Sequence, residues 1–146
     1  MTDSAPTRFE QEIRIEARPE AVFPYFTEPS KMARWMGIDC KLEAAPGGAL
    51  RIDVNGENVA GGTYVEVEPP SRLVFTWGWE GSDEMPPGST TVEVSLTPDG
   101  DATIVHFVHR DLPASQVESH ATGWGHYLAR LAVAAAGGDP GPDSHH

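Results

Sequence analysis

The sequence predicts an α+β fold, in which an antiparallel sheet of about seven strands packs on one face against helices. Three observations predict it: an alternating strand-like segment opens the chain, six more strand-like segments follow, and one long amphipathic helix comes last. The 146 residues fit a single domain. We expect residues 9–136 to form this domain and residues 1–8 and 137–146 to be flexible ends.

The first third of the chain predicts one strand and two short helices. Residues 9–17 alternate between apolar and polar side chains, as in a half-buried strand. Pro19 suits the first turn of a helix, whereas Pro24 removes a backbone donor and should bend or shorten that helix. A second short helix is expected after Pro29, with Trp35 on its apolar side.

Six strands are expected between residues 40 and 110, because turn sequences separate stretches rich in Val, Thr, Tyr, Phe and Trp. Asn55-Gly56 and Asp99-Gly100 tolerate the positive φ angles of tight hairpins. Successive strands should therefore pair with one another in antiparallel fashion.

Residues 117–136 predict the long helix, because apolar side chains recur on one face at helical spacing. Ser115 and Glu118 are spaced as a capping box, and the pair Gly137-Gly138 predicts the end of the helix. The apolar face must be buried against another surface, and the sheet is the only large one expected.

Two glycines, Gly123 and Gly125, flank Trp124 inside this helix, where each costs roughly 1 kcal/mol relative to alanine. Two explanations are open. The missing side chains let the helix approach the sheet or leave room for a ligand beside the indole, or the glycines contact the small helices through their backbone.

The formal net charge of −12 repels phosphate groups and anionic lipid surfaces, so we expect neither nucleic-acid nor membrane binding. We find no apolar run long enough to span a membrane and no signal-peptide pattern, which predicts a cytoplasmic protein. The lone Cys40 excludes an intramolecular disulfide and is expected to be inert. The chain should be a monomer or a homodimer.

No metal or cofactor site is predicted. His106 and His109 should face opposite sides of a strand, and His120 and His126 opposite sides of a helix, so neither pair can chelate a metal. The glycine pairs lack the neighbouring residues of a nucleotide-binding loop.

Five segments, taken in order, resemble the START-like SRPBCC superfamily, and within it the homologues of the activator of heat-shock-protein-90 ATPase. They are Ile15-x-Ala17-x-Pro19-x-x-Val22-Phe23; Thr27-Glu28-Pro29 with Arg34-Trp35; Glu66-Val67-x-Pro69-Pro70-x-Arg72-Leu73-Val74-Phe75-Thr76-Trp77; Thr103-x-Val105-x-Phe107-x-His109; and Gly123-Trp124-x-x-x-Leu128-x-x-Leu131. The resemblance spans roughly residues 9–136.

This resemblance implies a helix-grip fold, in which a curved antiparallel sheet wraps the C-terminal helix and leaves a cavity, often for an apolar ligand. The superfamily contains ligand carriers, cyclase-like enzymes and chaperone cofactors, so the fold does not fix the activity. Pro24, inside the first helix, and Asp111, after the histidine, depart from the usual pattern.

Aromatic and histidine side chains are the candidate ligand contacts, since many of them fall on the predicted inner faces. For any single aromatic residue, plain core packing is the alternative, and His109 can equally satisfy a backbone carbonyl. The candidates are Trp35, Tyr64, Phe75, Trp77, Trp79, Phe107, His109, His120, Trp124 and Tyr127.

Three functions follow from these expectations. The first is binding of a small hydrophobic or aromatic molecule between the sheet and the last helix. The second is a stress-related chaperone cofactor that acts through its surface. The third, ranked lowest, is a cyclase- or hydratase-like enzyme with His109 or His120 as base, for which a carboxylate such as Asp111 is the natural partner. The acidic loop at residues 82–84 should lie by the cavity mouth, either as a solvated loop or as a lid.

Overall fold

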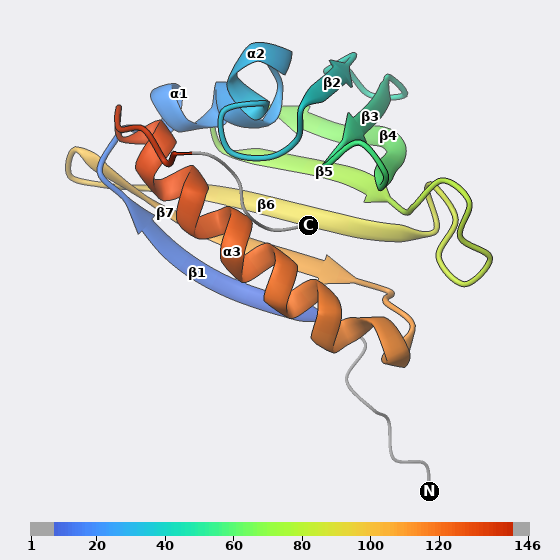
Figure 1. Cartoon of the computed structure of the whole chain (residues 1–146). Helices are drawn as coiled ribbons and strands as arrows, with labels where there is room; N and C mark the ends of the chain where they lie inside the picture. The colour runs from blue at the N-terminus through green and yellow to red at the C-terminus, as the bar shows by residue number, and fades with distance from the viewer. Residues whose placement is uncertain (1–7, 142–146) are drawn as a thin grey trace, which may run out of the picture.

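The computed structural model describes residues 8–141, in which a long helix lies across one face of a curved sheet (Figure 1). The sheet has seven strands in the order β1-β7-β6-β5-β4-β3-β2, and every neighbouring pair is antiparallel. The predicted α+β helix-grip architecture is therefore confirmed. The strands are β1 (Phe9–Ile15), β2 (Asp39–Leu42), β3 (Ala49–Asp53), β4 (Val59–Glu68), β5 (Arg72–Trp77), β6 (Thr90–Asp99) and β7 (Ala102–Arg110).

Short helical segments follow β1, as predicted. Helix α1 (Pro19–Val22) passes directly into the 3-10 helix η1 (Phe23–Phe26), and Pro24 lies in the first turn of η1. This proline ends the α-helical hydrogen bonding after a single turn. Helix α2 (Pro29–Met32) also begins with a proline.

The last helix, α3 (Val117–Ala135), is preceded by the 3-10 turn η2 (Ala114–Gln116). Its apolar stripe is buried as predicted, whereas the predicted capping box is wrong. No side chain caps α3, and the Ser115 hydroxyl donates instead to Glu84 of a distant loop. Gly137, at a φ of 94°, follows the end of the helix, where a left-handed residue is expected.

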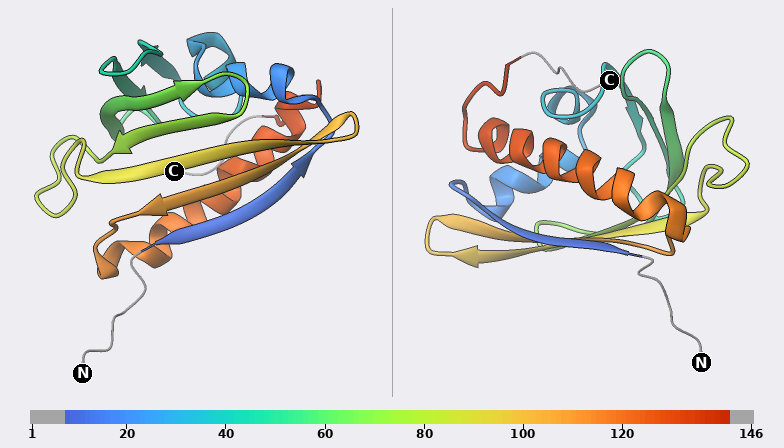
Figure 2. Two further views of the ribbon diagram at one scale, coloured as in Figure 1. Left: turned by 180° about the vertical axis from the view of Figure 1, so that it is seen from behind. Right: turned by 60° about the horizontal axis from the view of Figure 1, so that its bottom comes forward.

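The small helices are bound to the C-terminal half of α3 (Figure 2). The Tyr25 hydroxyl donates to the carbonyl of Ala134, and the Arg130 guanidinium donates to the carbonyl of Trp35. Trp35 in turn donates its indole N–H to the carbonyl of Tyr25 at 2.9 Å. These bonds attach the small helices to the C-terminal half of α3, whereas open space lies beside its N-terminal half.

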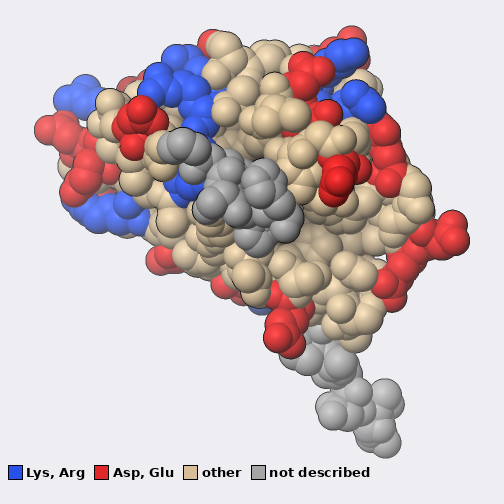
Figure 3. All heavy atoms as spheres, in the orientation of Figure 1, with Lys and Arg blue, Asp and Glu red and all other residues tan. Residues whose placement is uncertain are grey.

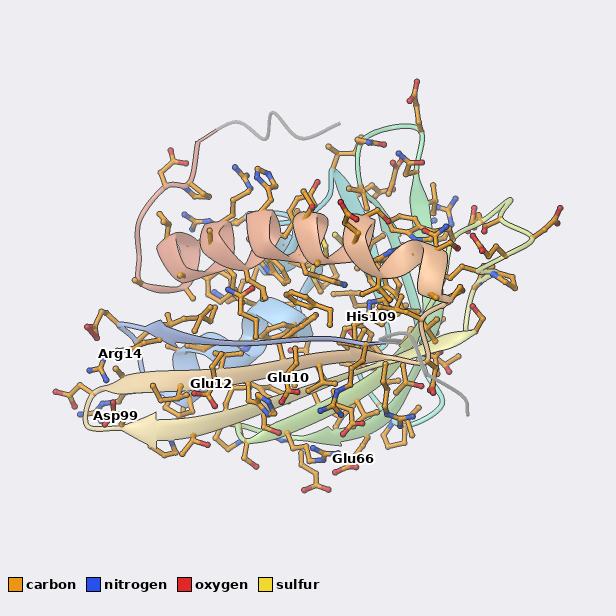
Figure 4. The ribbon with its side chains drawn as sticks, turned by 90° about the horizontal axis from the view of Figure 1, so that it is seen from below. Glu10, Glu12, Arg14, Glu66, Asp99 and His109 are labelled. Atoms are coloured by element: carbon orange, nitrogen blue, oxygen red, sulfur yellow. The ribbon has the colours of Figure 1, made fainter. Side chains whose placement is uncertain are left out.

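Charged side chains cover the opposite face of the sheet, where Arg72 and Arg110 both donate to Glu93, and Arg72 also to Glu66. Figure 4 shows Glu66 on this outer face and His109 between the sheet and α3. On the face seen in Figure 3, acidic side chains are scattered and do not form one patch.

The predicted flexible ends lie outside the described residues, apart from residue 8 and residues 137–141. Within residues 8–141 no helix is long and apolar enough to cross a membrane.

Candidate functional site

A cavity of about 410 Å³ lies between the N-terminal half of α3 and the concave side of the sheet. This volume falls in the usual range for a small-molecule site. Its walls come from α3, the end of β5 and the turn between β3 and β4. The lining residues are Met36, Val54, Asn55, Asn58, Trp77, Trp79, Ser82, Gln116, Ser119, His120, Gly123, Trp124 and Tyr127.

One chain of hydrogen bonds joins α3 to β7, β6 and β5 behind the cavity wall. Trp124 Nε1 donates to His109 Nδ1 at 2.8 Å, and His109 Nε2 lies 2.8 Å from the Thr90 hydroxyl. That hydroxyl donates to the carbonyl of Trp77 at 2.6 Å. Because an indole nitrogen can only donate, His109 Nδ1 must accept, so its proton lies on Nε2.

A second chain lies nearer the mouth and assigns the opposite tautomer to His120. Trp79 Nε1 donates to His120 Nε2 at 3.0 Å, so this nitrogen carries no proton. His120 Nδ1 lies 2.8 Å from the carbonyl of Gln116 and therefore donates to it. The two imidazole rings pack edge to face, 5.4 Å apart between centroids.

Burial favours the neutral form of both histidines. Burial, with a smaller effect of the neighbouring His120, lowers the pKa of His109 to about 3. Burial also lowers the pKa of His120, although its bond to Gln116 opposes the shift. Protonation of either ring would direct a new N–H against an indole N–H that already points at it.

This arrangement leaves neither His109 nor His120 a free ring nitrogen for general-base chemistry. All four ring nitrogens of His109 and His120 are used in the two chains. Asp111, the carboxylate that an enzyme of the cyclase or hydratase kind would pair with a histidine, accepts from Arg110 instead. Within residues 8–141, the hydrogen bonds of His109 and His120 include no carboxylate.

Trp77 packs between the other two cavity tryptophans. Its ring centroid lies 5.6 Å from that of Trp79 and 5.0 Å from that of Trp124. Within residues 8–141, Trp77 Nε1 is the one buried side-chain nitrogen or oxygen without a hydrogen-bond partner. A buried, unpaired donor is costly and uncommon in native proteins.

Both helix glycines have room for a side chain. A Cβ built on Gly123 or on Gly125 would meet no atom within 4 Å. No close approach of the small helices or of the sheet therefore requires a glycine at either position. Gly123 lines the cavity and Gly125 does not. The remaining explanation, space for a ligand beside Trp124, therefore applies to Gly123 alone.

The loop between β5 and β6 is bound to η2, the turn that precedes α3. The Glu84 carboxylate accepts from the Ser115 hydroxyl and from Gln116 Nε2, which lowers the pKa of Glu84. Ser82 of the same loop lines the cavity, and Met85 is buried. The loop therefore lies at the cavity mouth as expected, and it is attached there by a carboxylate.

We expect Glu84→Ala to loosen this loop, because two hydrogen bonds to η2 are lost. Amide hydrogen exchange of residues 80–88 should become severalfold faster, while exchange in β6 and β7 stays unchanged. Asp83→Ala, in the same loop, is the matched control. Equal exchange in both variants would show that Glu84 does not hold the loop.

Five of the sequence-predicted ligand contacts line the cavity, namely Trp77, Trp79, His120, Trp124 and Tyr127. The other five are buried elsewhere. Trp35 and Tyr64 donate to the carbonyls of Tyr25 and Phe26, Phe75 packs between Tyr64 and Trp77, Phe107 packs on Trp124 at 4.6 Å, and His109 lies behind Trp124.

Sequence reasoning missed the polar rim and two apolar wall residues. Asn55 and Asn58 belong to the β3–β4 turn, so their type indicates only a turn. The Asn55 side-chain oxygen accepts from the backbone N–H groups of Glu57 and Asn58, and the Asn58 side-chain amide donates to the same oxygen. Gln116 is the last residue of η2 and Ser119 lies in the first turn of α3, and neither carries a distinguishing sequence pattern. Met36 and Val54 carry no signal beyond apolarity.

No group of His, Cys, Asp or Glu side chains in residues 8–141 is arranged to hold a metal ion. Cys40 is buried, which raises the pKa of its thiol to about 12. A thiol with this pKa is protonated at neutral pH and a poor nucleophile.

Comparison with known proteins identifies relatives of this architecture. The family model described as Activator of Hsp90 ATPase homolog 1-like protein matches residues 16–136. An AHSA1-like protein from Rhizobium etli is 42% identical, with a TM-score of 0.75 over 100% of this chain and 93% of that one. No curated protein matches the sequence.

Two further solved structures share the fold. DynU16, from the dynemicin biosynthetic locus, is 24% identical with a TM-score of 0.80, and the match covers 92% of this chain. This chain spans about half of DynU16, at 49% of its length. An HSP90 activator from Plasmodium falciparum is 21% identical with a TM-score of 0.72, over 86% of this chain and 94% of that one.

Proposed function

The chain belongs to the family of Activator of Hsp90 ATPase homolog 1-like proteins, and from its cavity we propose that it binds a small, largely apolar or aromatic molecule between the sheet and α3. The cavity of about 410 Å³ beside three tryptophan rings carries this proposal. Aromatic walls with a few polar groups at the rim are typical of small-molecule sites.

The composition of the wall supports binding of a ligand over catalysis. Trp77, Trp79 and Trp124 provide flat apolar surface, and His120 and Tyr127 lie among them. Both nitrogens of His120 are hydrogen-bonded, and His109 lies behind Trp124 rather than at the cavity surface. We therefore do not propose a cyclase- or hydratase-like activity that uses either histidine as its base.

A direct test uses N-phenyl-1-naphthylamine, an uncharged aromatic probe that fluoresces in apolar surroundings. We expect saturable binding of one probe per chain, with energy transfer from the cavity tryptophans to the probe. Native mass spectrometry of the protein purified from its own host should also detect a retained small molecule. A probe signal that rises without saturation, together with a ligand-free mass, would contradict the proposal.

The second candidate is a chaperone cofactor that acts through its surface, favoured by the family description and by the shared fold of the Plasmodium falciparum activator. Stimulation of the ATPase of an Hsp90 from the same organism would support it. Stimulation unaffected by filling the cavity would separate this function from ligand binding. A cytoplasmic location and a monomeric or homodimeric state stay predictions.

A further inference from the structure

Most polar groups of the cavity wall are already used within the protein. Trp79 and Trp124 donate to His120 and His109, and the Gln116 amide donates to Glu84. At the rim, the side-chain oxygens of Asn55 and Ser82 accept from backbone N–H groups. A ligand therefore finds few groups that it can bond without breaking an existing bond.

Trp77 has a buried donor that no group in the described part of the chain uses. Its indole N–H is buried, has no partner within residues 8–141, and belongs to a side chain that lines the cavity. An indole nitrogen is a donor only, so the group that satisfies it must be an acceptor. Such a group gains more from this unpaired donor than from a donor that must first leave another bond.

The cavity is also uncharged. No Asp, Glu, Lys or Arg is among its lining residues, and burial lowers the pKa of His120, which favours its neutral form. An ionised ligand would lose its hydration without gaining a counter-ion. An anion would in addition approach a chain of net charge −12.

Resting on the proposed function, we propose that the ligand is an uncharged aromatic molecule with a hydrogen-bond acceptor, such as a carbonyl oxygen, that pairs with Trp77 Nε1. This nitrogen is buried, and the rings of Trp79 and Trp124 pack against that of Trp77. Trp77 thereby selects ligands by an acceptor at a fixed place on an apolar skeleton.

Three probes with one skeleton test the proposal: fluorene, which has no acceptor; 9-fluorenone, which adds a carbonyl; and 9-fluorenone-2-carboxylate, which adds a charge. We expect fluorenone to bind about two- to tenfold more tightly than fluorene, as one hydrogen bond allows. The carboxylate should bind at least about tenfold more weakly than fluorenone, because its charge stays unpaired. Titration calorimetry measures all three.

Trp77→Phe removes the donor and keeps an aromatic ring, so the preference for fluorenone over fluorene should disappear. Trp79→Phe is the matched control, because its N–H is already bonded to His120. Trp79→Phe can weaken the binding of both probes but should leave the ratio of their affinities unchanged. In the wild type, the Trp77 indole proton, assigned from its absence in Trp77→Phe, should resonate further downfield with fluorenone than with fluorene.

The outcomes separate the two proposals. Equal binding of fluorene and fluorenone, with the same Trp77 resonance in both complexes, would overturn the proposed bond between Trp77 and an acceptor. The cavity would still be a binding site. Equal binding of fluorenone and its carboxylate would overturn the requirement for an uncharged ligand. No binding of any probe would overturn the proposed function and this inference together.

Discussion

Acidification from pH 6.5 to 4.5 is expected to destabilise the protein before most of its carboxylates are protonated. In the unfolded chain His109 binds a proton below about pH 6.5, whereas in the folded protein its pKa is about 3. Between these values the unfolded state holds more protons, so the free energy of unfolding falls as the pH falls. His120, whose pKa is also lowered, acts in the same direction.

The size of the loss from His109 alone is on the order of 2 kcal/mol over this window, since each pH unit is worth up to about 1.4 kcal/mol per proton. His109→Gln provides the comparison, because an amide can accept from Trp124 and donate to Thr90 without titrating. Urea unfolding at pH 6.5, 5.5 and 4.5 should give a shallower decline for His109→Gln than for the wild type. Parallel declines would show that His109 titrates normally in the folded state.

Filling the space at Gly123 should make the protein more stable and less able to bind a ligand. Gly123→Ala and Gly125→Ala should each raise the free energy of unfolding by roughly 0.5–1 kcal/mol, because alanine favours the helix and its Cβ meets no neighbour. Leucine at position 123 would in addition extend into the cavity beside Trp124. We expect it to weaken binding of N-phenyl-1-naphthylamine by about tenfold or more.

Gly125→Leu is the matched control, since position 125 lies in the same helix but does not line the cavity. It should leave the affinity for the probe within about twofold of the wild type. Probe titration and urea unfolding of the four variants measure both quantities. Similar affinity in both leucine variants would mean that the probe does not occupy the space at Gly123.

Local patterns were enough to predict the order of the elements. Alternation over residues 9–17 and helical spacing over residues 117–136 depend on which face is buried, and both segments bury the expected face. The predicted interruption at Pro24 also has a local cause, the missing backbone donor. The capping box failed for a non-local reason: Ser115 bonds to Glu84, 31 positions earlier in the chain.

The site was only partly predictable, because alternation gives the face of a strand but not the depth along it. Phe75 and Trp77 share the inner face of β5, yet only Trp77 reaches the cavity. Phe107 and His109 likewise share the inner face of β7, and both lie behind Trp124. Which of them touches open space depends on where α3 crosses the sheet, and this crossing is set by long-range packing.

The chain of hydrogen bonds through His109 cannot carry protons to or from the cavity, because of the groups at its two ends. It begins at the indole N–H of Trp124, which does not ionise near neutral pH, and ends at the carbonyl of Trp77, which is a very weak base. Neither end can exchange a proton with a guest molecule, so the chain is not a proton wire. These hydrogen bonds therefore deliver no proton to a bound molecule, even one that acid would degrade.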